Sequence, residues 1–215
     1  VWALYVDSFV GDVSKVGYLT ALLAFISFFS YFYFIPLMQK ADKGKLFLYS
    51  LIMLGAVYLL FSFIKSFYLF LALSILFTIV LALRVMTFGI IVKDSSGKGE
   101  LSKNEGLKYT FANIAFVIGP LIAGYILGSF GMKYVFVVAG VVTLIGALFF
   151  WESGIKDSKK SKKINAGMFK NFFSFFHSKK RIVAYILGGG VSLWWGLIYL
   201  FVPLYMVRSG LPEIY

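Results

Sequence analysis

The sequence contains no cysteine, and among its 215 residues it has one histidine and nine acidic residues. Without cysteine, a disulfide framework, a thiol nucleophile and a thiolate metal site are all excluded. With so few histidines and carboxylates, the chain has few side chains that could act as acids or bases in a hydrolytic reaction. We therefore expect neither an enzyme nor a protein built around a metal ion or another cofactor.

Charged residues are also scarce. They make up 14% of the chain, whereas hydrophobic residues make up 60%, and the mean hydropathy is +0.89. A soluble domain is nearer half apolar and a quarter charged. A water-soluble fold of this size could not bury so much apolar surface, but a lipid bilayer can receive it, so we expect the bilayer to be the main partner of the chain.

Six long runs lack aspartate, glutamate, histidine and lysine, and each is near the ~20 residues that a helix needs to cross the hydrocarbon core. Helices satisfy their own backbone hydrogen bonds in lipid, whereas a β-barrel would show short alternating segments. The sequence therefore predicts an all-α, polytopic transmembrane helix bundle. The short apolar stretch Val1–Val6 is interpreted as the outer end of an earlier span. The six runs are Val16–Gln39, Leu46–Ile64, Ser66–Val92, Tyr109–Met132, Tyr134–Trp151 and Ile182–Val207.

The basic residues predict the orientation of the chain. Sixteen of the 21 lysines and arginines fall in alternate connections, 40–45, 93–108 and 152–181, against four in the other connections and Arg84 inside a run. Basic loops face the cytoplasm. We therefore expect a multi-pass protein of the cell (plasma or inner) membrane with a cytoplasmic N-terminus and a cytoplasmic 153–181 loop. The net charge of +12 then reflects topology and anionic lipid headgroups rather than a nucleic-acid partner.

The long basic connection divides the chain. We expect a first transmembrane bundle at residues 1–152, a basic cytoplasmic linker at 153–181 and the first helix of a second bundle at 182–215. Within the linker, four phenylalanines recur at helical spacing, which suits a helix lying in the membrane interface. They are Phe169, Phe172, Phe173 and Phe176.

Three local patterns accompany this organisation. The connection Pro36–Lys45 contains Asp42, Gly44 and Lys45, and the run Tyr109–Met132 contains Gly119-Pro120 followed by Gly124. A glycine permits a tight turn, a proline bends a helix, and small residues at four-residue spacing let helices approach closely. In addition, Leu-Tyr recurs near the outer ends of the first and last apolar segments, at Leu4 and Leu204.

With the six runs and the basic linker, these patterns resemble the major facilitator superfamily. The resemblance implies two six-helix halves, of which this chain would supply the first and the start of the second. It also implies that Asp42, Gly44 and Lys45 act as a conformational latch at the cytoplasmic turn. The match departs from the family pattern, because Pro36 replaces the usual first glycine and Asp42 stands one place late. Gly119, Pro120 and Gly124 would form a bent helix face that packs against the other half.

Arg84 is the one charged residue inside a complete run. A charge at the centre of a transmembrane helix costs about 2.5–3.5 kcal/mol on insertion scales, so such a residue calls for an explanation. Arg84 either faces a central cavity, where it contacts an anionic substrate or a gate, or extends its guanidinium to the cytoplasmic headgroups. The superfamily often has an arginine in its fourth helix, although here Gly89 follows one residue later than usual.

Two further residues are candidates for a substrate path. Asn113 is a strong hydrogen-bonding group within a run, and it either binds substrate or ties two helices together. Trp194 lies near the middle of Ile182–Val207, where anchoring at the membrane interface does not explain it. It either lines a cavity or faces lipid or a neighbouring helix.

The coupling mechanism is not visible in the sequence. Proton-coupled carriers use titratable groups within the membrane, whereas here Asp7 and Asp12 lie only at an outer edge. A coupling ion, proton or sodium, therefore stays open, as does facilitated diffusion. The function that the sequence favours is transport of a small solute by alternating access. The alternative is a polytopic scaffold or sensor that transports nothing.

Overall fold

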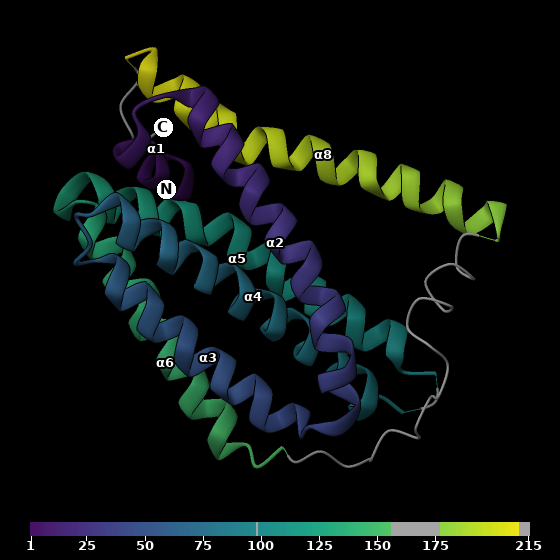
Figure 1. The fold of residues 1–215 in the computed structure, drawn as a ribbon. Coiled ribbons are helices and arrows are strands. Elements are labelled where there is room, and N and C mark those ends of the chain that lie inside the picture. Colours follow the sequence, from purple (N-terminus) through teal and green to yellow (C-terminus); the bar gives the residue numbers. More distant parts are fainter. Residues whose placement is uncertain (98, 156–176, 211–215) are drawn as a thin grey trace.

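The structure, a computed structural model, describes residues 1–97, 99–155 and 177–210. Within these ranges the chain forms seven helices and no strand, so it is an all-α bundle (Figure 1). The helices are α1 (Trp2–Val10), α2 (Val13–Lys40), α3 (Lys43–Phe61), α4 (Phe67–Ser95), α5 (Leu101–Phe130), α6 (Met132–Glu152) and α8 (Lys179–Arg208).

Six of these helices, all except α1, are long and apolar enough to cross a membrane. They coincide with the six predicted runs, which confirms the predicted fold class. The largest difference is at α5, which begins at Leu101 rather than Tyr109, about two turns earlier. The added turns carry an ion pair between Glu105 and Lys108, so the helix continues past the charge-free run from which its span was predicted.

Short polar caps set where the helices begin. The Asp12 carboxylate accepts hydrogen bonds from the backbone N–H groups of Ser14 (2.7 Å) and Lys15 (3.4 Å) and so caps α2. Asp42 caps α3 in the same way, by accepting from the Lys45 N–H at 3.0 Å. These acceptors satisfy amide groups that the first turn of a helix leaves free.

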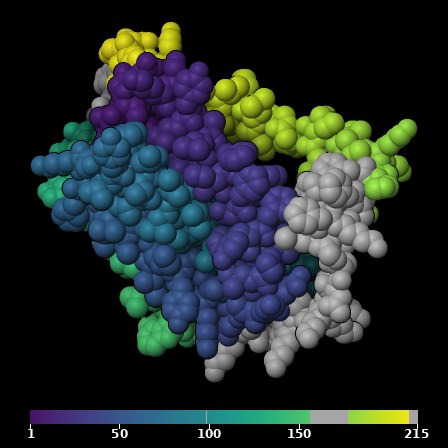
Figure 2. Space-filling model, in the orientation of Figure 1, coloured from purple at the N-terminus to yellow at the C-terminus, as the bar shows by residue number. Residues whose placement is uncertain are grey.

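The connections define two ends of the bundle. The lysine-rich end carries the connections 40–43 and 95–101 and the start of α8, and the lysine-poor end carries 10–13, 61–67, 130–132 and the end of α8. Figure 1 shows α3 and α6 side by side along the bundle, whereas the last part of α8 lies beside α1 and its start lies away from the bundle. Figure 2 shows this last part of α8 against the N-terminal helices.

The largest buried cluster lies at the lysine-poor end. It joins residues of α1, α2, α3, α4, α6 and α8. Aromatic rings fill much of it, and the Tyr5 hydroxyl donates a 2.7 Å hydrogen bond to the Phe61 carbonyl, which satisfies a polar group that would otherwise be buried alone. The cluster includes Val6, Val16, Phe61, Phe70, Phe136 and Leu204.

Most of the predicted linker, including the four phenylalanines of the expected interfacial helix, lies outside the described residues. The division into 1–152, 153–181 and 182–215 stays a prediction.

Candidate substrate path

Arg84 lies in the half of α4 nearer the lysine-rich end and is partly buried. Its Nε is buried and has no hydrogen-bond partner within the described part of the chain. One turn further, the buried Thr87 hydroxyl donates to the carbonyl oxygens of Leu83 (2.8 Å) and Arg84 (3.0 Å). Part of the Arg84 side chain is therefore buried in the bundle, and its position at a central cavity stays a prediction.

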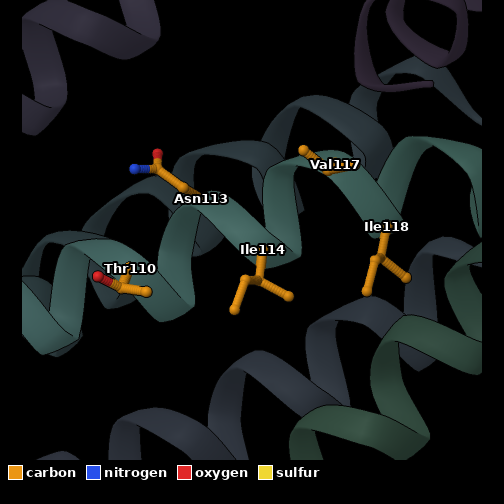
Figure 3. A pocket seen from close by; sticks show the side chains of 5 residues that line it. All are labelled: Thr110, Asn113, Ile114, Val117 and Ile118. Atoms are coloured by element: carbon orange, nitrogen blue, oxygen red, sulfur yellow. The ribbon is translucent and has the colours of Figure 1, made fainter.

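Asn113 lies near the middle of α5, and its side chain is exposed. It borders an open hollow of about 450 Å³ that is lined by Thr110, Asn113, Ile114, Val117 and Ile118. Figure 3 shows its amide projecting on the same side of α5 as Val117, whereas Ile114 and Ile118 point to the other side. The Thr110 hydroxyl donates to the Gly106 carbonyl of its own helix (3.0 Å).

The Asn113 amide, by contrast, makes no hydrogen bond with any described residue. In the structure it therefore does not tie α5 to another described helix. An unpaired amide facing hydrocarbon is costly, and a role of Asn113 in a substrate path stays a prediction.

Trp194 is exposed on α8. The next residue, Trp195, is the one that joins a ring stack. Its ring lies parallel to that of Tyr199, with centroids 5.4 Å apart and planes at 19°. Tyr199 in turn stacks on Phe116 of α5 at 6.1 Å and 19°. We call these three residues the ring ladder. It connects α5 with α8 through Phe116, near the middle of α5, and Tyr199, in the second half of α8.

The predicted latch residues lie at the turn between α2 and α3. Asp42 acts as the cap of α3, and Lys45 supplies the N–H that it accepts. At Gly44, a Cβ atom would lie 2.9 Å from the Ile155 carbonyl oxygen and 3.3 Å from Asp42 Oδ1. Glycine is therefore required here because the chain leaving α6 passes close to this turn. A role of the turn in latching one conformation stays a prediction.

The predicted small-residue face of α5 is open. Cβ atoms placed on Gly119 and Gly124 would meet nothing within 4 Å, and Pro120 lies inside the helix between them. The face is not in close contact with any described helix, so its packing against a second half stays a prediction.

α8 is fastened to the first helices at the lysine-poor end. Arg208 Nη2 donates to Asp7 Oδ1 at 2.9 Å and to the Gly11 carbonyl at 3.3 Å. Leu204 is 1% exposed and belongs to the large buried cluster. The ring of Phe201 lies 3.5 Å from where a Cβ of Gly17 would be. These contacts close the lysine-poor end between α8, α1 and α2, and we call them the α8 closure.

The structure thus separates the sequence candidates into three places. Arg84 lies toward the lysine-rich end, Asn113 lies near mid-helix beside the ring ladder, and Asp42, Gly44 and Lys45 lie at the lysine-rich turn. Sequence reasoning missed Phe116 and Tyr199. The i, i+4 spacing of Trp195 and Tyr199, which places both on one helix face, was the available signal, but no sequence pattern indicated their partner on α5.

Comparison with known proteins gives one match. The family model described as Major Facilitator Superfamily matches residues 1–215. No curated protein and no solved structure matches the chain. Within the described residues, no group of three or more histidine, aspartate or glutamate side chains is placed to hold a metal ion.

Proposed function

The chain belongs to the Major Facilitator Superfamily, a family of membrane transporters, and from this premise we propose that it serves transport of a small solute by alternating access. In such a mechanism a central site opens to one side of the membrane at a time. The proposal requires a closure at one end of the molecule and an open path at the other.

The observation that carries the proposal is that α8 is packed against other helices near its end and is mostly exposed over its first two thirds. At the lysine-poor end, Leu204 is buried and Arg208 is paired with Asp7. From Lys179 to Leu197, by contrast, most side chains of α8 are exposed. This is the arrangement expected of a conformer that is closed at the lysine-poor end and open toward the lysine-rich end, which we take as cytoplasmic.

A reversible lock on the α8 closure tests the proposal without knowledge of the substrate. The full-length protein, with cysteines outside this chain replaced, carries Asn113→Cys together with Asp7→His and Arg208→His. The two histidines replace the ion pair between α1 and α8 and are designed to bridge these helices through a Zn²⁺ ion. A membrane-impermeant thiol reagent is applied from each side of the vesicles. We expect labelling from both sides without Zn²⁺, from the lysine-rich side alone with Zn²⁺, and from both sides again after chelation.

A matched control uses Glu105→His and Lys108→His, which bind Zn²⁺ within one helix because they lie at i, i+3. This pair joins no separate elements, so Zn²⁺ should leave labelling at position 113 unchanged. A scaffold or sensor predicts a different result for the closure pair, namely labelling from one side or neither regardless of Zn²⁺. That result would reject alternating access.

A further inference from the structure

We propose that the ring ladder of Phe116, Tyr199 and Trp195 is a stacking subsite for a solute that carries a flat, unsaturated ring, with the Asn113 amide receiving the hydrogen-bonding edge of that ring. The proposal rests on the proposed transport function, because it assigns a substrate class to the space between α5 and α8.

The location of the ladder supports this assignment. Trp195 lies near the middle of the apolar run Ile182–Val207, and Phe116 lies within the run Tyr109–Met132, in the half nearer the lysine-rich end. Transporter sites lie near the bilayer midplane, and Trp195 is close to that depth. The three rings come from two elements, so they lie between the first bundle and α8. On α8 the ladder adjoins the large buried cluster, because Leu200, the residue after Tyr199, packs against that cluster.

The free faces of the ladder are available to a ligand. Within the described chain, Tyr199 is the one ring partner of both Phe116 and Trp195. The side chains of Phe116 and Trp195 are 60% and 48% exposed. Parallel, offset rings are a favourable arrangement for aromatic groups, and another flat ring can extend the same stack on either end.

Asn113 adds the polar group that a mainly apolar site needs for orientation. It precedes Phe116 by three residues, so the two side chains emerge from neighbouring positions on one side of α5. Its amide offers both donors and an acceptor and is not engaged by any described residue. The ligand edge that complements it also carries a donor beside an acceptor, as carboxamides and nitrogen heterocycles do.

The reporter for the test is Ser192→Cys in the full-length protein. Ser192 shares a face of α8 with Trp195 and Tyr199, at i+3 and i+7, and is not itself part of the ladder. Labelling of this thiol is measured with benzamide, nicotinamide or adenine present at millimolar concentration. Cyclohexanecarboxamide is the matched control, because it keeps the carboxamide and replaces the flat ring with a saturated one.

We expect at least one planar compound to slow labelling in a saturable manner, with cyclohexanecarboxamide much weaker. Loss of one stacked ring costs about five- to a hundredfold in affinity, so Trp195→Ala and Phe116→Ala should raise the half-maximal concentration by such a factor. Trp195→Phe, which keeps a ring, should largely restore it. The controls Leu193→Ala and Phe111→Ala, which truncate exposed side chains on the same helices, should leave it unchanged.

The proposal is overturned if none of the planar compounds protects the thiol, if the saturated compound protects it equally, or if the ladder variants bind as the parent does. Equal protection by the saturated compound would identify a nonspecific apolar surface. Protection is measured at equilibrium and needs no alternation. If planar rings bind but the Zn²⁺ test fails, the ring subsite is supported and alternating access is rejected. If the Zn²⁺ test succeeds but no planar ring binds, alternating access is supported and the ring subsite is rejected.

Discussion

Asp12 is a single residue that fixes where α2 begins, at a position outside the membrane-spanning segments. Hydrogen bonds from the Ser14 and Lys15 amides lower the pKa of its carboxyl group below the ordinary value of 3.8, and the charges of Lys15 and Arg208 add to the effect. Because the pKa is depressed in the folded state, the carboxylate stabilises the fold fully above pH 3.8. This stabilisation is lost as the pH falls through the folded pKa.

We predict that Asp12→Asn removes this acid-sensitive contribution. Asparagine is also a good helix cap, so at neutral pH the variant should unfold at a temperature close to that of the parent. Below pH 3.8, the parent should lose stability that the Asn variant keeps, so a difference in unfolding temperature should open between the two proteins. The measurement is the thermal unfolding temperature of parent and variant in lipid nanodiscs, at neutral pH and at acidic pH. Asp12→Ala, which loses the cap entirely, is the comparison and should be the less stable at neutral pH. A parent and an Asn variant with parallel pH profiles would contradict the assignment.

The helices α3 and α6 approach each other closely through two glycines. A Cβ on Gly55 would lie 2.6 Å from Leu144 Cγ and 3.3 Å from the Gly140 carbonyl oxygen, and a Cβ on Gly140 would lie 2.8 Å from Leu59 Cγ and 3.0 Å from the Gly55 carbonyl oxygen. The two glycines thus face each other across the interface. In lipid, such close packing replaces the hydrophobic effect as the force that joins helices.

Gly140→Val should therefore separate α3 from α6. Overpacking of a tight interface costs about 1–3 kcal/mol, so we expect a clear fall in the unfolding temperature of the full-length protein. Gly146→Val on the same helix is the matched control, because a Cβ at Gly146 meets nothing within 4 Å. Equal effects at the two positions would show that the loss reflects helix propensity rather than the contact with Gly55.

The helices themselves were accessible to sequence reasoning because lipid imposes a simple rule. A long run without charge, such as Leu46–Ile64, has to be a helix, and α3 confirms it. The rule does not indicate which faces meet. Gly55 and Gly140 look like any other glycine of an apolar run, and the contact of Phe116 with Tyr199 joins helices that are far apart in the sequence. Arg84 was found by its charge alone, whereas the burial of its Nε required the structure.

For the molecule as a whole, the packing is concentrated at one end. The large buried cluster and the α8 closure lie at the lysine-poor end, and α8 diverges from the bundle toward the lysine-rich end (Figure 1). The ion pair between Asp7 and Arg208 is partly exposed, with 22% and 45% of the two side chains accessible, and surface pairs contribute about 0–1 kcal/mol. The closure therefore depends mainly on packing, with Leu204 at its centre.

Leu204→Ala should shift the whole molecule toward a state that is open at the lysine-poor end. Truncation of a buried leucine costs about 2–5 kcal/mol, and this cost falls on the closed conformer because Leu204 packs with the cluster that contains Val6 and Val16. A shift above about 1.4 kcal/mol exceeds tenfold in population. Labelling of Asn113→Cys from the lysine-poor side should therefore accelerate by at least about that factor wherever opening limits the rate.

Leu197→Ala is the control for this last prediction, since Leu197 lies on the same helix and is exposed. It should leave the labelling rate near that of the parent. If Leu204→Ala accelerated labelling from both sides equally, local unfolding of α8 would explain the result. Acceleration confined to the lysine-poor side, reversed when Zn²⁺ bridges histidines at positions 7 and 208, would instead show that the closure sets the balance between the two conformers.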